Sequence, residues 1–292
     1  MKSGAFAFLD CLGFKGIWQR VDPRLVLKKL TGIQGDYLLE SAKDSASFSL
    51  IRCGLIRTKV LCLSDSIAIS LTFDEEIHRE KDVGDFHLIG AISTIVSTII
   101  DSYLRTKPHL ILRGCITFGE HAIEENFMIG PAVDDAVENE RKADGAFIWF
   151  TRVAEELRTQ FDDHMSGFTA ERNDENPCIE LVTEQELHQL KETEKIFRKF
   201  GPIPSVIRNY SMPITKERPN IECSIMNPLA TCTSPRELDE KIGIYQTVMI
   251  SDREDVNRKR RNTEAFLLHC KETTERYRSS VAQYLTNFGN NT

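Results

Sequence analysis

The chain lacks a long apolar segment and an excess of positive charge, and each absence excludes a class of protein. The longest apolar run, residues 88–100, is interrupted by serine and threonine and is too short to span a bilayer, so we expect a buried helix there. The formal net charge is −7, which argues against a surface for a polyanion. We therefore expect neither a membrane nor a polymeric nucleic acid as partner.

The cysteines also lack the paired spacing of a zinc site. Eight cysteines are scattered along the 292 residues, several of them inside apolar runs where a free thiol packs as a small hydrophobic group. No secretory signal precedes the first predicted strand, so we expect reduced thiols and a cytoplasmic protein. Among them, Cys115 is expected in the core rather than as a nucleophile, because no histidine or asparagine can be named as its partner.

The sequence does contain successive segments in which apolar residues recur at the spacing of a strand or of a helix. These predict a strand from residue 5, a helix over 23–43, two strands within 59–70, a helix over 86–104, a strand over 110–119, a helix from 130 to 143, a strand over 146–150, a helix over 151–161, a loop over 166–177, a helix over 183–200, strands over 206–214 and 221–226, and a helical segment over 237–288. The predicted fold is α+β, a mixed sheet flanked by helices with a helical C-terminal extension. Residues 1–165 are the expected core, and residues 166–292 complete or extend the same domain.

The first apolar run reaches one carboxylate, Asp10, and breaks at Gly13. This pattern predicts a buried strand that enters a tight loop. Asp10 at the end of such a strand is in position to hold a hard cation. The alternative is that Asp10 caps the following helix or starts a turn.

A second carboxylate, Asp65, lies at the expected tip of a hairpin between the two strands within 59–70. If the first strand lies beside this hairpin, Asp10 and Asp65 converge, and a divalent cation relieves their repulsion. The adjacent loop 12–14 can turn backbone N–H groups toward an anion. Bound cations next to backbone amides that hold phosphate are typical of sites that catalyse phosphoryl transfer.

Four motifs in this order resemble the catalytic domain of class III nucleotidyl cyclases. They are Asp10–Phe14, the hairpin tip at Asp65, the strand 113–120 and the helix that begins at Gly130-Pro131-Ala132. Within that superfamily the chain most resembles the bacterial pyrimidine cyclases of Pycsar anti-phage systems, over residues 5–161. The resemblance implies a homodimer that converts UTP or CTP to a cyclic monophosphate, which a separate effector detects.

The resemblance also implies roles for particular residues. Asp10 and Asp65 would bind two Mg²⁺ or Mn²⁺ ions, with the backbone carbonyl of Cys11 as a further ligand. The amides of Leu12, Gly13 and Phe14 would hold the terminal phosphates of the substrate. Activation of the ribose 3′-hydroxyl would then lead to attack on the α-phosphate.

Two positions depart from the purine-specific members of the superfamily. Their transition-state asparagine and arginine correspond here to Asp134 and Glu138, and their base-reading lysine corresponds to Leu61. Arg113 or Arg141 are candidate substitutes for the missing arginine, and Arg113 is equally consistent with a structural ion pair. The departures favour a pyrimidine cyclase, UTP ahead of CTP.

Two further interpretations remain open: a degenerate cyclase-like module that binds a nucleotide or a partner, and a purine cyclase with an altered pocket. The acidic group around residues 134–140 is expected on a solvated helix face. The histidines His109, His121 and His164 do not cluster, so packing or surface roles are expected for them. Gly114, in mid-strand, predicts the close approach of a neighbouring group.

Overall fold

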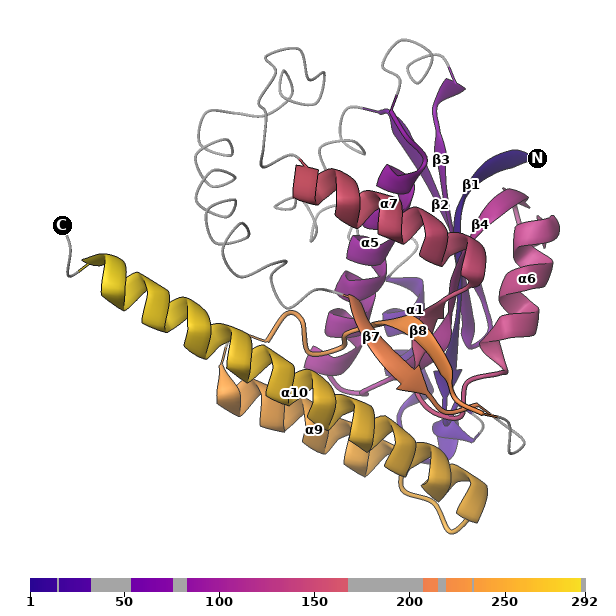
Figure 1. The fold of residues 1–292 in the computed structure, drawn as a ribbon. Coiled ribbons are helices and arrows are strands. Elements are labelled where there is room, and N and C mark those ends of the chain that lie inside the picture. Colours follow the sequence, from indigo (N-terminus) through magenta and orange to yellow (C-terminus); the bar gives the residue numbers. More distant parts are fainter. Residues whose placement is uncertain are drawn as a thin grey trace.

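The structure, a computed structural model, describes residues 1–14, 16–32, 54–75, 83–167, 207–214, 219–232 and 234–289. Its strands are β1 (Lys2–Leu12), β2 (Ile56–Leu63), β3 (Ser66–Phe73), β4 (Ile111–Glu124), β5 (Phe127–Ile129), β6 (Ile148–Phe150), β7 (Ile207–Met212) and β8 (Ile221–Met226). Its helices are η1 (Ile17–Gln19), α1 (Pro23–Thr31), α5 (Phe86–Arg105), α6 (Pro131–Glu140), α7 (Arg152–Gly167), α9 (Pro235–Val248) and α10 (Glu254–Gly289). The predicted α+β fold with a sheet flanked by helices is confirmed (Figure 1).

The strands form one mixed sheet in the order β2-β3-β1-β4-β6-β8-β7, with β5 paired to β4. Strands β4 and β6 are parallel, and the other paired strands are antiparallel. The first four long strands follow the split β-α-β arrangement, in which β1 lies between the hairpin β2-β3 and β4. This topology brings the end of β1 next to the tip of the hairpin.

Helix α6 lies on one face of the sheet, and α5 and α7 lie on the other (Figure 1). From β4, Cys115 Sγ donates to the carbonyl of Ala136 and Thr117 Oγ1 donates to Asp135 Oδ2, so these odd-numbered positions face α6. Alternate side chains of a strand share a face, and Asp10 pairs with Arg113 in the register. Asp10 therefore belongs to the α6 face.

Helix α5 forms the core of the opposite face. It is the one helix in the described part of the chain that is long and apolar enough to cross a bilayer, and it lies mostly buried inside the fold. Leu88, Ile92 and Val96 are fully buried along its length. The prediction of a buried helix is confirmed, and so is the core position of Cys115.

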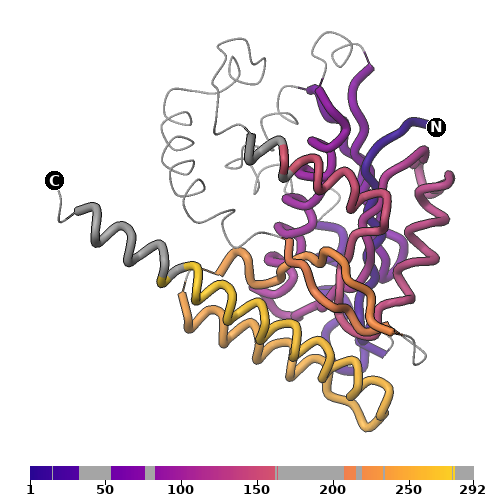
Figure 2. Tube along the Cα trace, viewed as in Figure 1, coloured from indigo at the N-terminus to yellow at the C-terminus, as the bar shows by residue number. Residues whose placement is uncertain are grey.

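The segment 237–288, predicted to be helical, is helical except at residues 249–253. The segment forms two helices, α9 and α10, that lie side by side (Figures 1 and 2). Between them Ser251 Oγ accepts a hydrogen bond from the amide of Arg253, a local bond that competes with helix formation. Helix α10 is then fixed by the buried carboxylate of Asp144, which accepts hydrogen bonds from Arg258 and Asn262.

Other boundaries differ less. The short strand β5 has no counterpart among the predicted elements, and β4 continues beyond the predicted end at residue 119. Residues 166–167 belong to α7 rather than to a loop. The predicted helix 183–200, the rest of the predicted loop 166–177 and the predicted helix beyond residue 32 lie outside the described residues.

His121 of β4 is buried at 1% exposure in the sheet. Its Nδ1 donates to the carbonyl of Gly119 (2.9 Å), so its Nε2 accepts from the hydroxyl of Ser70 (2.7 Å). Burial lowers the pKa of this imidazole below its usual value, against the hydrogen bond to Gly119. The ring is therefore neutral in the fold, as expected for a packing role.

The neutral His121 makes stability depend on pH. The pKa of His121 is lower in the fold than in the unfolded chain, so as the pH falls the unfolded chain binds a proton before the folded protein does. The stability that is present above about pH 6.5 is therefore lost as the pH falls below that value. We expect the free energy of unfolding in urea to fall between pH 7 and pH 5, by at most about 1.4 kcal/mol per pH unit from this group. His121→Gln should reduce that slope, and equal slopes in the two proteins would exclude the assignment.

Candidate active site

Asp10 and Asp65 come together at one end of the sheet. Asp10 pairs with Ser66, the first residue of β3, and the amide of Cys11 donates to the carbonyl of Asp65 (2.9 Å). The turn Ser64-Asp65 joins β2 and β3, with Ser64 at a positive φ of 59°. The hairpin predicted around Asp65 is present, and the charge of Asp65 acts on the carboxyl of Asp10.

The oxygen donors at this end suit a divalent cation. The amide of Cys11 faces the hairpin, and in an antiparallel strand the carbonyl of the same residue faces the same way. Two carboxylates and a backbone carbonyl are hard ligands of the kind that Mg²⁺ and Mn²⁺ take. Within the described residues no group of three or more His, Cys, Asp or Glu side chains is placed to hold a metal ion, so further ligands would come from water or substrate phosphate.

Arg113 is a cation in direct contact with Asp10. Its Nε donates to Asp10 Oδ2 (3.1 Å) and lies 2.6 Å from Glu140 Oε1, at the end of α6. Arg141, the other candidate arginine, has a side chain 80% exposed and lies 3.8 Å from the second oxygen of Glu140. Of the two, Arg113 is the one that contacts the predicted metal ligand.

The predicted solvated face of α6 is wrong for two of its acidic residues. Asp134 and Glu138 are exposed, but Asp135 bonds to Thr117 and Glu140 is buried. The helix packs on the sheet through the stripe that contains Ala132 and Ala136, and Glu140 follows them at the same spacing of four. That spacing is the one signal in the sequence that could have pointed to Glu140 as an inward residue, and it was not used in the prediction.

The electrostatics of the cluster favour the arrival of positive charge. Burial raises the pKa of Asp10, Arg113 opposes the rise, and Asp65 adds to it. Burial also raises the pKa of Glu140, again against Arg113. The carboxylates of Asp10 and Glu140 therefore share the guanidinium of Arg113, and the charge of Asp65 also acts on Asp10, so a divalent cation would relieve negative charge there.

The loop after β1 has the backbone form expected of an anion cradle. Gly13 and Gly16 have positive φ angles of 72° and 74°, which glycine adopts without strain. The carbonyl of Gly13 accepts from Arg20 Nη2 (2.6 Å), whereas the amides of Gly13 and Phe14 donate no hydrogen bond within the described residues. Leu12, the last residue of β1, pairs with Ile111 of β4.

Leu61 lies on the same face of the sheet as Asp10. Asp10 pairs with Ser66 and Ser66 pairs with Leu63, two residues along β2 from Leu61. Its side chain is buried at 4% exposure. Sequence reasoning included Leu61 but missed Ser66, whose side chain bonds to the carboxylate of Asp10.

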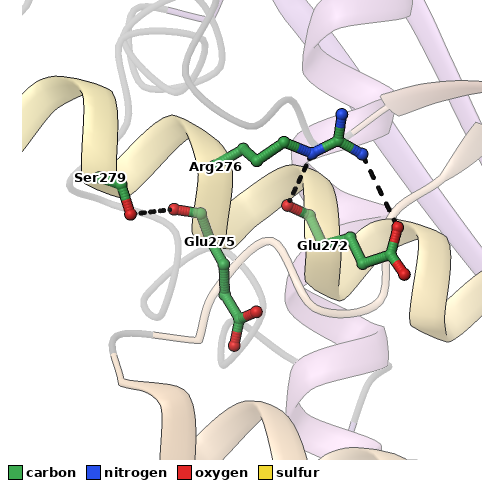
Figure 3. Close-up of a pocket in the computed structure, with 4 residues that line it drawn as sticks. All are labelled: Glu272, Glu275, Arg276 and Ser279. Atoms are coloured by element: carbon green, nitrogen blue, oxygen red, sulfur yellow. Dashed lines mark hydrogen bonds and ion pairs between the residues drawn. The ribbon is translucent and has the colours of Figure 1, made fainter.

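A separate hollow of about 580 Å³ lies beside α10 and is lined by Glu272, Glu275, Arg276 and Ser279 (Figure 3). Arg276 Nε donates to the carbonyl of Glu272 (3.4 Å), and Ser279 Oγ donates to that of Glu275 (3.0 Å). All four lining residues come from one helix, whereas ligand sites gather polar groups from several elements. The end of β1 is therefore the stronger candidate.

No family model matches the chain, and no curated protein matches it. Among solved structures it is similar to the guanylyl cyclase domain of the RhoGC fusion protein from the aquatic fungus Blastocladiella emersonii, with 16% identity and a TM-score of 0.38 over 55% of this chain and 86% of that one. It is also similar to the catalytic core of a rhodopsin-guanylyl cyclase in complex with ATPalphaS, with 12% identity and a TM-score of 0.39 over 77% and 94% of the two chains. A class III adenylyl cyclase-like ATP-binding protein from Pseudomonas aeruginosa gives 15% identity and a TM-score of 0.33 over 66% and 40%. At these TM-scores the likenesses carry no conclusion about what this chain binds.

Proposed function

We propose that the protein is a nucleotidyl cyclase that converts UTP, or less favourably CTP, into the 3′,5′-cyclic monophosphate and pyrophosphate. The observation that carries the proposal is the meeting of Asp10 and Asp65 at the end of β1, directly beside the loop 12–14. Carboxylates for cations next to amides for phosphate are what phosphoryl transfer requires.

Each residue of the site has a role that follows from its position. Asp10, Asp65 and the carbonyl of Cys11 would hold two Mg²⁺ or Mn²⁺ ions, which supply charge neutralisation and acidify the ribose 3′-hydroxyl when bound. The amides of the loop 12–14 would hold the β- and γ-phosphates. Arg113, beside Asp10, would neutralise charge on the phosphates.

The reaction forms one phosphorus–oxygen bond and breaks one. The ribose 3′-oxygen attacks the α-phosphorus as its proton passes to water, and the bond from the α-phosphorus to the bridging oxygen of pyrophosphate breaks, so that pyrophosphate leaves with the electron pair. The role of the protein is to place these atoms in line and to stabilise the charge that develops on the phosphate oxygens.

The choice of a pyrimidine rests on the resemblance. Leu61 has no donor for a purine edge, and Asp134 and Glu138 stand on the exposed side of α6 in place of an asparagine and an arginine. As in the resembling enzymes, the active form would be a homodimer, and the cyclic nucleotide would act on a separate effector in anti-phage defence.

The acidic pair Asp134 and Glu138 also favours a second candidate, a catalytically degenerate domain that binds a nucleotide and regulates a partner. A negative side chain at either position repels a triphosphate, so turnover must rely on Arg113. The degenerate domain would bind a nucleotide in the presence of Mn²⁺ without forming product.

The test is incubation of the purified protein with each of the four ribonucleoside triphosphates and Mn²⁺, with the products resolved by mass spectrometry. We expect a cyclic monophosphate from UTP, and less from CTP. A cyclic product from ATP or GTP alone would indicate a purine cyclase. No product with Mn²⁺, with Mg²⁺ or with phage-infected lysate as activator would favour the binding module.

A further inference from the structure

Asp10 already has a counter-ion on one of its two carboxylate oxygens. Arg113 Nε donates to Asp10 Oδ2 at 3.1 Å, and the two side chains are only 19% and 22% exposed. A guanidinium and a divalent cation a few ångströms apart repel each other strongly in a site so poorly solvated. A cation on Asp10 Oδ2 would therefore compete with Arg113 for that oxygen.

Glu140 provides a second place for Arg113. Its side chain is 4% exposed, and Oε1 lies 2.6 Å from Arg113 Nε yet accepts no hydrogen bond within the described residues. The N–H of Arg113 points to Asp10 instead. If Arg113 turns away from Asp10, this buried oxygen can accept the N–H, and no charge is left unpaired.

We propose that Arg113 competes with the divalent cation for Asp10, and that Glu140 is the positioning residue that retains Arg113 in the site after the cation displaces it. This inference rests on the proposed function, because it assumes that the cation binds Asp10. It places a mobile positive charge on the wall of the site at the moment when a triphosphate can bind.

The test is the affinity for Mn²⁺ without nucleotide, measured by electron paramagnetic resonance on the full chain. The double variant R113Q/E140Q removes one positive and one negative charge, so the cluster of three side chains keeps its formal charge of −1. A general field effect predicts unchanged affinity, whereas competition predicts about tenfold tighter Mn²⁺ binding, since one charge-assisted hydrogen bond no longer has to be broken. Unchanged or weaker binding overturns the proposal.

The matched control is R236Q/E240Q, the same exchange in an exposed ion pair of α9 (Nε to Oε1, 2.8 Å), for which Mn²⁺ affinity should not change. If R113Q/E140Q does not fold, the Mn²⁺ affinity of the variant E140D tests the role of Glu140 instead. It keeps the charge but withdraws the carboxylate from Arg113, so we expect weaker Mn²⁺ binding, and unchanged affinity refutes the role of Glu140.

The failure of this inference can be told from the failure of the proposed function. If Asp10→Asn abolishes Mn²⁺ binding but R113Q/E140Q binds as the natural protein does, the cation site stands and the competition is wrong. If Asp10→Asn leaves Mn²⁺ binding unchanged, the cation does not occupy Asp10, and both proposals fall.

Discussion

Asp10→Asn is expected to lower the rate of cyclic nucleotide formation at least about a thousandfold while the fold remains intact. Asparagine keeps the size of the side chain and can still accept from Arg113, but it loses the negative charge that would hold the cation. Asp65→Asn should have the same effect, since the two carboxylates meet at one site. The measurement is the initial rate with the triphosphate that gives product, at saturating Mn²⁺.

The control for this experiment is Glu240→Gln, an exposed carboxylate of α9 that pairs with Arg236. Its activity should equal that of the natural protein. Thermal unfolding of all variants separates loss of the site from loss of the fold. A rate within a few-fold of normal in a folded Asp10→Asn or Asp65→Asn variant would rule out the assignment of two metal-binding carboxylates.

Gly114→Ala is expected to destabilise the protein by about 3 kcal/mol or more, through a backbone clash. A Cβ at this position would lie 2.1 Å from the carbonyl oxygen of Phe8 and 2.9 Å from the Cα of Leu9. Both atoms belong to the backbone of β1, so β4 would have to move away from it. The free energy of unfolding in urea measures the effect.

Gly243 of α9 is the matched control. A Cβ there meets nothing within 4 Å, so Gly243→Ala should stabilise the helix by about 0.5–1 kcal/mol. If Gly114→Ala unfolds at the same urea concentration as the natural protein, the close approach of β1 and β4 is not as described. Loss of this contact would also disturb the pairing of Asp10 with Arg113, one residue away in the register.

Gly114 also shows which features the sequence reveals. A glycine inside an apolar strand has few explanations, and the predicted close approach of a neighbour is confirmed by the backbone of β1. The hairpin around Asp65 and the buried helix α5 were likewise predictable, because strand alternation and helical periodicity are local signals. The α+β fold follows from the order of these elements.

Features that depend on tertiary contacts were not predictable in the same way. Glu140 is charged, and only the packing of α6 on the sheet shows that it lies inward beside Arg113. The break between α9 and α10 depends on a local bond at Ser251 and on the anchoring of α10 by Asp144. The pairing of Arg113 with Asp10 required the strand register, which periodicity alone does not give.

The central claim is that Asp10 and Asp65 hold divalent cations next to a triphosphate bound at the loop 12–14. The most direct test is a crystal structure of the protein with Mn²⁺ and a non-hydrolysable analogue of UTP, with data collected at the manganese absorption edge. The account predicts anomalous peaks in coordination contact with both carboxylates and terminal phosphates against the amides of Gly13 and Phe14. Peaks at another site, with the analogue bound away from the end of β1, would contradict it.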